Sequence, residues 1–527
     1  MENPSACSRA LCITEIVRII CGEVPTFPRH SLSSLARASK IFMNPALDNL
    51  WSELTGLFSL VKCMPETLWE ERAEGAKKTV CFRRPIIAAD LPRLLFYSVR
   101  VKSFTMEESE LDREALRALS VVLTFQSMMP RLSTLVWTPD DATFPLAHQL
   151  LGSNLRSLIL ELDDTIPSLS LFPYIKASCP LVTNFRLSLA SMVSPSTHEQ
   201  ISDVVCGWQH LELLSIPALD LTGFIHVSQL PSLTYLHLTE GILGEVGHSD
   251  LPRLLPGTNR FPALKSFDIA FKTSSFCADL VRIISSRKLY ALSIVLLQIW
   301  TAATWEELFT IFHQHLDHDQ LTSIHISQSV KCVLPVHLVP YMLSADAFRP
   351  LLAFNGMISF VFQIYPGSTI DDNALAEMAT AWPVAPHGHT ATLACLIPFA
   401  RFCRILCTLG IRMRTSDIPE FSQVAGDQTR EDLRTLNVGT SPIVADPETA
   451  GKVAAFLSNL FPQLEKINVH APQVHFEPFV RYAAGWTSVS QLVPIFSSVR
   501  SQEKNLWDAE AKLTEEDSDS EDGDHDG

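Results

Sequence analysis

The chain lacks the short glycine-containing motifs that identify nucleotide-binding enzymes and serine hydrolases. Its 527 residues contain no phosphate-binding Gly-x-x-x-x-Gly-Lys, no Gly-x-Gly-x-x-Gly and no Gly-x-Ser-x-Gly. One glycine-rich stretch, GILGEVG at 241–247, is predicted to be a flexible turn rather than a nucleotide loop. We therefore expect no catalytic residues and no enzymatic activity, and an enzyme whose site the sequence conceals is the least favoured alternative.

Cysteine pairs with metal-ligand spacing are also missing. The 12 cysteines are scattered and include no Cys-x-x-Cys pair, which predicts buried, reduced thiols of an intracellular protein rather than zinc ligands. The segment HQHLDHD at 313–319 places His315 and His318 at helical spacing, as metal ligands can be. Because this segment directly precedes a repeat, we interpret it as surface and helix-end residues. No metal and no cofactor are expected.

Long apolar runs and a surplus of basic residues are absent too. The first apolar stretch is interrupted by Glu15 and Arg18, and the most apolar window, 390–411, contains Arg401 and Arg404, which a membrane span would have to bury. The net charge is −16, so we expect neither nucleic acid nor a membrane as a partner. No Asn-x-Ser/Thr acceptor with a permitted middle residue occurs, which fits a cytoplasmic and/or nuclear protein.

The residues that are present predict a folded body with many short elements. Hydrophobic residues make up 47% of the chain, charged residues 19%, and 33 prolines outnumber 20 glycines. A chain of this length exceeds a single compact core, so either several domains or an elongated repeat array is expected.

A three-position spacing recurs along most of the chain. FPALKSFDI at 261–269 and FPQLEKINV at 461–469 both place apolar residues at i, i+3 and i+5, with proline two residues before i. We call each occurrence of this spacing a rung. The rungs are Val101-Phe104-Met106, Leu132-Leu135-Trp137, Leu155-Leu158-Leu160, Val182-Phe185-Leu187, Leu211-Leu214-Ile216, Leu233-Leu236-Leu238, Leu264-Phe267-Ile269, Leu289-Leu292-Ile294, Leu321-Ile324-Ile326, Leu433-Leu436-Val438 and Leu464-Ile467-Val469. Weaker rungs are expected at Met357-Phe360-Phe362 and Phe402-Ile405-Cys407, where an insertion is the alternative.

Strand geometry explains this spacing. Residues i+3 and i+5 lie on one face of a short strand, and residue i enters from the preceding turn. Prolines at 130, 180, 231, 262 and 462 would end the preceding helix. The pattern predicts an α/β fold: an irregular leucine-rich-repeat solenoid with parallel strands on the concave face and helices on the convex face.

A different pattern precedes the repeats. ITEIVRII at 13–20, SLSSLARASKIF at 31–42 and NPALDNLWSEL at 44–54 are each predicted to be a short helix. In the third, Asn44 is suited to the N-cap and Pro45 to the first helical position. Three helices of this size bury little, so the unit is expected to pack on a partner or on the repeats behind it.

These three segments resemble the F-box of fungal F-box proteins that carry leucine-rich repeats. The matching residues are Ile13, Glu15, Ile16, Val17 and Ile20 in the first segment, Ser31, Leu32, Leu35, Ala36, Ser39 and Phe42 in the second, and Pro45, Ala46, Leu47, Leu50 and Trp51 in the third. The sequence departs from the family at Thr14, where proline is usual, and at Cys21, where phenylalanine is usual. The segment 83–104 is similar to the one that joins box to repeats.

The resemblance implies a substrate receptor of a Skp–cullin–F-box ubiquitin ligase. Its partners would be a Skp-type adaptor, the cullin complex and an unidentified target protein. The implied adaptor-binding residues are Ile13, Ile16, Val17, Ile20, Leu32, Leu35, Leu47, Leu50 and Trp51. The alternative is a leucine-rich-repeat scaffold without ligase attachment, in which the first helices only cap the array.

The predicted organisation has six parts. They are an extension at 1–9, the F-box-like module at 10–55, a helical linker or cap at 56–100, the solenoid at 101–475, a carboxy-terminal cap at 476–510 and an acidic disordered tail at 511–527. Within the tail, residues 515–527 hold eight acidic side chains and no Lys or Arg, and Ser518 and Ser520 are followed by acids, so phosphorylation is an alternative to a purely solubilising tail.

The target surface is predicted on the strand side chains that alternate with the buried ones, at i+2, i+4 and i+6. Polar groups dominate these positions. The side chains expected to carry target binding are Glu161, Arg186, Tyr235, His237, Asp268 and His325.

Overall fold

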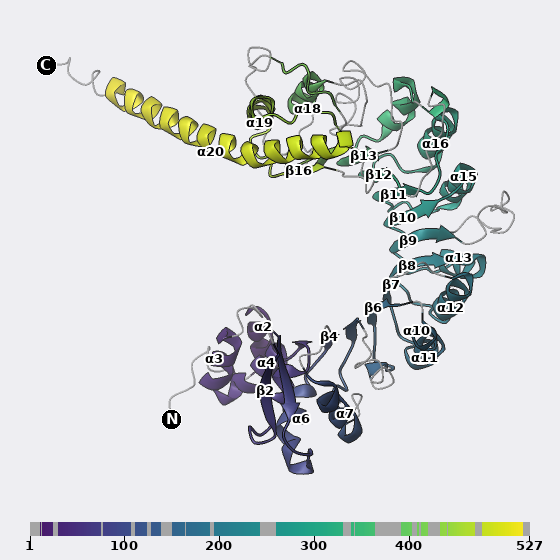
Figure 1. Cartoon of the computed structure of the whole chain (residues 1–527), viewed down its shortest axis with the longest axis vertical. Helices are drawn as coiled ribbons and strands as arrows, with labels where there is room; N and C mark the ends of the chain where they lie inside the picture. The colour runs from purple at the N-terminus through teal and green to yellow at the C-terminus, as the bar shows by residue number, and fades with distance from the viewer. Residues whose placement is uncertain are drawn as a thin grey trace. The chain divides into compact units, whose positions relative to one another are not determined.

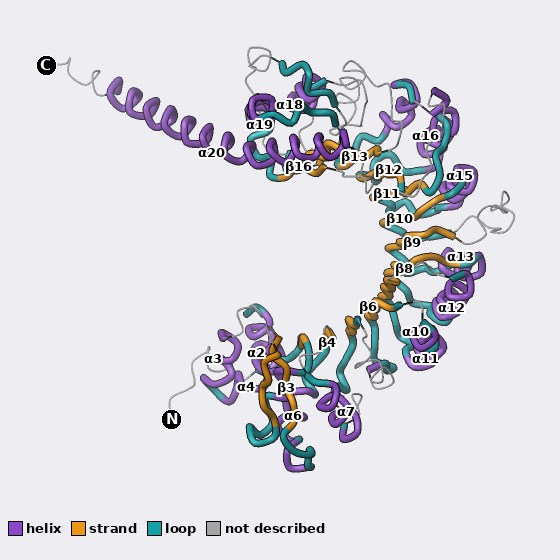
Figure 2. The backbone as a smooth tube through the Cα atoms, viewed as in Figure 1, coloured by secondary structure: helices purple, strands orange, loops and turns teal. Residues whose placement is uncertain are grey.

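The computed structural model contains one long parallel sheet and one short antiparallel hairpin (Figures 1 and 2). It describes residues 11, 13–24, 30–74, 77–106, 111–123, 128–138, 150–163, 165–189, 194–242, 260–329, 339–341, 343–363, 392–402, 408–410, 413–419, 433–439, 441–469 and 477–519. The chain divides into two compact units, 1–238 and 239–527, and the division falls inside strand β9.

The 14 strands of the parallel sheet follow one another in chain order, as expected of a repeat array. Strands that begin in the first unit are β1 (Glu53–Thr55), β4 (Ser103–Met106), β5 (Thr134–Trp137), β6 (Ser157–Leu162), β7 (Asn184–Leu189), β8 (Leu213–Leu219) and β9 (Tyr235–Ile242). Those of the second unit are β10 (Ser266–Phe271), β11 (Ala291–Leu296), β12 (Ser323–Gln328), β13 (Ser359–Gln363), β14 (Thr408–Gly410), β15 (Thr435–Gly439) and β16 (Lys466–Val469).

Helices and 3-10 helices precede, connect and follow the strands. In the first unit they are α2 (Thr14–Gly22), α3 (His30–Ala38), α4 (Lys40–Leu50), α5 (Phe58–Val61), η1 (Ala88–Asp90), α6 (Pro92–Ser98), α7 (Arg113–Val122), α10 (Ile166–Leu169), α11 (Leu171–Ser178), α12 (Pro195–Cys206) and α13 (Leu221–Ser228). In the second unit they are α15 (Ser274–Ile283), α16 (Ala302–His315), η4 (Val339–Tyr341), η5 (Ala345–Ala353), η6 (Leu393–Cys395), α18 (Leu396–Phe402), α19 (Pro447–Leu460) and α20 (Glu477–Asp519).

Side-chain caps fix where several of these helices begin. Asp112 accepts a hydrogen bond from Ala115 N (2.6 Å), and Asp220 accepts one from Gly223 N (2.7 Å). Asp446 does the same for Thr449 N at 2.9 Å, ahead of Pro447 in the first turn of α19. Each cap satisfies a backbone N–H that the helix itself leaves without a partner.

Burial confirms the predicted spacing in nearly every rung. The i, i+3 and i+5 side chains are buried from Val101 to Phe362 and again from Leu433 onward, apart from the half-buried Val469. The five prolines lie in turns ahead of the strands. Within each unit the helices lie along one side of the sheet, α11 to α13 beside β6–β8 and α15 and α16 beside β10–β12 (Figure 1). The opposite side, which carries the i+2 and i+4 side chains, is called the open face below.

A second repeating position was not recognised in the sequence. The residue at i+1 in several rungs is Ser or Thr, and its hydroxyl donates to the backbone carbonyl at i+1 of the preceding rung. The pairs are Ser133 to Lys102 O (3.2 Å), Thr183 to Arg156 O (3.3 Å), Thr234 to Glu212 O (3.0 Å) and Thr322 to Tyr290 O (3.2 Å). These bonds add a side-chain ladder to the backbone ladder.

Two rungs differ from the prediction. Strand β14 pairs Leu409 with Phe360, so Leu409 occupies position i+3, and the predicted rung at Phe402-Ile405-Cys407 is wrong by four residues. Phe402 instead ends helix α18. An additional rung precedes the series, because β1 pairs Leu54 with Phe104, which puts Trp51 at position i. Its i+5 residue is Gly56, with φ of +66°, a conformation that glycine adopts without strain but that leaves no apolar side chain to recognise.

Helix limits and the regions flanking the repeats also differ. The third helix begins at Lys40, not at Asn44, because the Ser39 side chain caps it by accepting from Ile41 N (3.3 Å), and Pro45 lies inside the helix. The linker at 56–100 is not wholly helical, since β2 (Trp69–Glu74) and β3 (Lys77–Phe82) form an antiparallel hairpin there. Helix α20 continues to Asp519, so residues 511–519 of the predicted tail are helical, while 520–527 lie outside the described residues.

Candidate functional site

The α2–α4 module has a small core of its own. Val17, Cys21, Leu32 and Ala46 are fully buried against one another, and Leu35 and Leu50 pack around them. Burial also raises the pKa of the Cys21 thiol, because the thiolate would lose its solvation. Cys21, one of the two positions at which the sequence departs from the F-box pattern, is therefore a core position in this chain.

The predicted adaptor-binding residues divide into three groups by exposure. Val17 and Leu32 are buried in the module core, and Ile16, Leu35, Leu47, Leu50 and Trp51 are half-buried. Ile13 and Ile20 are exposed by 47% and 39%. The structure thus leaves the two isoleucines at either end of the α2 stripe facing solvent.

Three further exposed apolar side chains of the module were missed in the sequence. They are Ile19 (65% exposed) on α2, and Ile41 (48%) and Met43 (38%) on α4. Ile41 and Met43 fell at the predicted end of one helix and before the next, so no helical face was assigned to them. Helices α2 and α4 pack against each other. Each of them also carries apolar side chains that are exposed.

Trp51 does not extend the exposed surface of the module. Its ring stacks on Tyr97 of α6, with ring centroids 4.7 Å apart and an interplanar angle of 25°. Arg100, just after α6, reaches back to α4, where it donates to Asn44 Oδ1 (3.0 Å) and lies 3.4 Å from Asp48 Oδ1. These contacts attach the module to the segment that leads into the repeats.

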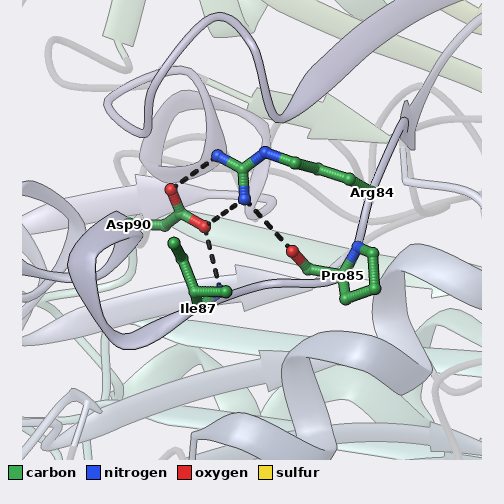
Figure 3. Close-up of polar contacts among 4 residues, drawn as sticks. All are labelled: Arg84, Pro85, Ile87 and Asp90. Carbon is green, nitrogen blue, oxygen red and sulfur yellow. Dashed lines mark hydrogen bonds and ion pairs between the residues drawn. The ribbon is translucent and has the colours of Figure 1, made fainter.

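That segment is held by an ion pair with bidentate geometry (Figure 3). Arg84 donates to both carboxylate oxygens of Asp90, at 2.7 and 2.8 Å, and Ile87 N donates to the same carboxylate at 3.0 Å. These hydrogen bonds, chiefly that of Arg84, lower the pKa of Asp90 to about 2. A third guanidinium contact, to Pro85 O (3.1 Å), closes the turn that precedes α6.

In the first unit, Glu161 and Arg186 are exposed on the open face, on the neighbouring strands β6 and β7. Glu161 accepts a hydrogen bond from Thr138 Oγ1 at 3.4 Å. Tyr235 and His237 are half-buried on β9, with ring centroids 6.5 Å apart, and His237 Nδ1 lies 3.0 Å from Ser215 Oγ. The structure places these four predicted residues on strands, as expected.

In the second unit, Asp268 is half-buried and His325 exposed, on β10 and β12. Both pair in register with Ser293 of β11, which lies between them. Protein atoms around the imidazole partly desolvate it, which lowers the pKa of His325. The negative charge of the Asp268 carboxylate opposes this shift. In this row the serine lies between the histidine and the carboxylate, whereas a nucleophilic triad has the histidine between the other two.

The histidine-rich segment after α16 is used within the fold. His313 and His318 stack with ring centroids 4.7 Å apart, and His318 Nε2 lies 2.7 Å from His313 O. The Asp317 carboxylate accepts from Asp319 N and Gln320 N. Across the part of the chain that the structure describes, there is no group of three or more His, Cys, Asp or Glu side chains placed to hold a metal ion. None of the helices in these described ranges has the length and apolar character of a membrane span.

Comparisons with known proteins find a weak likeness among solved structures. No family model matches the chain, and no curated protein matches it. Among solved structures, the crystal structure of the Rad7 and Elc1 complex in yeast contains a chain that is 12% identical, with 89% of this chain and 91% of that chain covered and a TM-score of 0.35.

Proposed function

We propose that this chain is the substrate-recognition subunit of a Skp–cullin–F-box ubiquitin ligase, in which the α2–α4 module binds a Skp-type adaptor and the open face of the repeats binds a target protein. The observation that carries the proposal is the exposure of Ile13, Ile19, Ile20, Ile41 and Met43 after the module has completed its own core. Several large aliphatic side chains exposed on one small module are typical of a surface that a partner covers.

The resemblance of these segments to an F-box identifies the partner that the proposal names. A Skp-type adaptor would cover Ile13 and Ile20, which belong to the matching stripe of the first helix. The repeats would then present a target protein at a fixed place, because Trp51 and Arg100 attach the module to the first repeats of the same unit.

A scaffold without ligase attachment is the second candidate. The contacts of Trp51 with Tyr97, and of Arg100 with Asn44 and Asp48, are also those of an amino-terminal cap on a repeat array. In that case the exposed isoleucines would have no adaptor to bind.

Co-expression with a Skp-type adaptor separates the two candidates. The wild-type chain should form a stoichiometric complex, and Ile20→Asp should weaken it at least tenfold, because a charge in an apolar interface costs about 2 kcal/mol or more. Ile20 is partly exposed, so the variant should remain folded. Val121→Asp on α7 is the matched control, since Val121 is 84% exposed outside the module. An unbound wild-type chain would leave the scaffold as the better description.

A further inference from the structure

One arginine occupies the middle of the open face in the first unit. Strand β7 presents Arg186 to solvent, and the pairing register aligns it with Ile159 of β6 and Ser215 of β8. Val136 of β5 continues the row beyond Ile159. Val136, Ile159 and Ser215 are half-buried, so the guanidinium projects from a mostly apolar and hydroxyl surface.

Arg186 has no partner among the described residues. It forms no ion pair within 4.0 Å and no hydrogen bond there, although Glu161 lies on the adjoining strand, where it accepts a hydrogen bond from Thr138. An arginine that serves only the fold normally pairs with a carboxylate or a backbone carbonyl, as Arg84 and Arg100 do in this unit. The position of Arg186 is therefore not explained by the fold.

A second polar group on the same side of β7 is also without a partner. Asn184 precedes Arg186 by two residues, so its side chain leaves the same face of the strand. Its Oδ1 atom is buried and accepts no hydrogen bond in the structure. A buried acceptor without a donor is unfavourable, so the side chain of Asn184, like that of Arg186, is not explained by contacts within the fold.

We infer that the open face of β6–β8 binds a segment of the target protein through a carboxylate side chain, which Arg186 receives as a two-point ion pair. The inference rests on the proposed function, because it names the chemical class of target that the repeats bind. The planar guanidinium matches both oxygens of a carboxylate, and arginine carries a disproportionate share of interface energy. The apolar Ile159 and Val136 would pack against aliphatic side chains that flank the acid.

The arginine side chains can report this binding directly. In full-length protein labelled with ¹⁵N-arginine, the Nε resonance of Arg186 is assigned by its loss in Arg186→Lys. The probes are three capped tripeptides, acetyl-Leu-Glu-Leu-amide, its Gln analogue and its phosphoserine analogue. We expect the Glu peptide to shift the Arg186 resonance saturably and the Gln peptide to have at least tenfold weaker effect. Arg156 is the matched control and should not respond. It is exposed, but it lies at position i+1 of the rung that contains β6 and therefore not on the open face.

Charge reversal provides the second test. Arg186→Glu should lose binding of a fluorescent Glu peptide and gain binding of the corresponding Lys peptide, whereas Arg156→Glu should change neither. Equal responses of Arg156 and Arg186, equal binding of the Glu and Gln peptides, or binding of the phosphoserine peptide alone would each overturn the inference. Adaptor capture by the wild-type chain depends on the α2–α4 module, so its absence would contradict the proposed function without affecting the peptide result, and Arg186→Glu should leave that capture unchanged.

Discussion

At the scale of single residues, the turn from the β2–β3 hairpin to α6 depends on one carboxylate. Asp90 is 3% exposed and receives three hydrogen bonds, two from Arg84 and one from Ile87 N. Each bond favours the charged form, which is why the pKa of this carboxyl falls from 3.8 to about 2. The carboxylate therefore stabilises the folded chain only where it is ionised.

Acid titration should expose this contribution. Because the pKa of Asp90 is depressed on folding, its stabilisation is fully present above about pH 4 and is lost as the pH falls toward 2. Asp90→Asn should lower the midpoint of urea unfolding at pH 7, and the difference from wild type should shrink below pH 4. The control is Asp163→Asn, at an exposed position outside these contacts. A difference that stays constant down to pH 2 would contradict the account.

Cys21 is a core residue of the α2–α4 module. The family comparison places phenylalanine at this position, but in this chain the side chain is fully buried between Val17, Leu32 and Ala46. A larger ring there would have to displace core atoms. The position thus belongs to the packing of the module and not to the surface that an adaptor would cover.

At the scale of elements, each rung is joined to the preceding one before its strand begins. The carbonyl of Arg156 accepts from Thr183 N, Asn184 N and the Thr183 hydroxyl, and Tyr290 O is used in the same way by Thr322 and Ser323. The hydroxyl bonds recur in both units, at rungs that are far apart in sequence. The residues that donate these bonds occupy a polar position of the repeat, which a pattern of apolar residues does not include.

Removal of one of these hydroxyls should cost about 1 kcal/mol of the free energy of unfolding. Thr183→Val keeps the shape of the side chain and deletes the donor, whereas Thr183→Ser keeps the donor and deletes a methyl group. We expect the valine variant to be the less stable of the two in urea unfolding followed by circular dichroism. The reverse order would show that the methyl group, rather than the hydroxyl, matters at this position.

At the scale of the whole molecule, the carboxy-terminal helix closes the second unit. Along its first half, α20 buries Trp486, Val489 and Val493, and Trp486 Nε1 donates to Ser441 O at 2.9 Å. Farther along, Arg500 donates to Ala455 O (2.8 Å) and contacts the Ser458 hydroxyl, both on α19. The helix covers the last repeats, as a cap of a repeat array must.

Two truncations should separate the cap from the acidic end. A chain that ends at residue 514 keeps every buried contact that the structure describes for α20, and its melting temperature should stay within about 1 °C of the full chain. A chain that ends at 476 loses three buried apolar side chains and should lose several kcal/mol of stability in the second unit. Differential scanning calorimetry distinguishes these outcomes, and a large change on removing 515–527 would show that the acidic end packs on the body.

The sequence by itself determined the repeat, because the i, i+3 and i+5 pattern follows from the alternation of side chains within a single strand. It also located the helical module, whose apolar stripes repeat within one or two turns. Both are local properties. The rung that was missed and the rung that was misplaced both lack a clear local signal: Gly56 has no side chain, and the segment around Leu409 contains several overlapping apolar triplets.

Only the tertiary structure decided which side chains of different repeats meet. The row of Ile159, Arg186 and Ser215 depends on the register between three strands, and the stacking of Trp51 on Tyr97 joins residues 46 positions apart in sequence. The difference between the exposed Ile20 and the buried Val17, neighbours on one predicted stripe, depends on where α3 and α4 pack against α2. Hydrogen bonds and packing between distant segments set these relations, and no spacing within one segment records them.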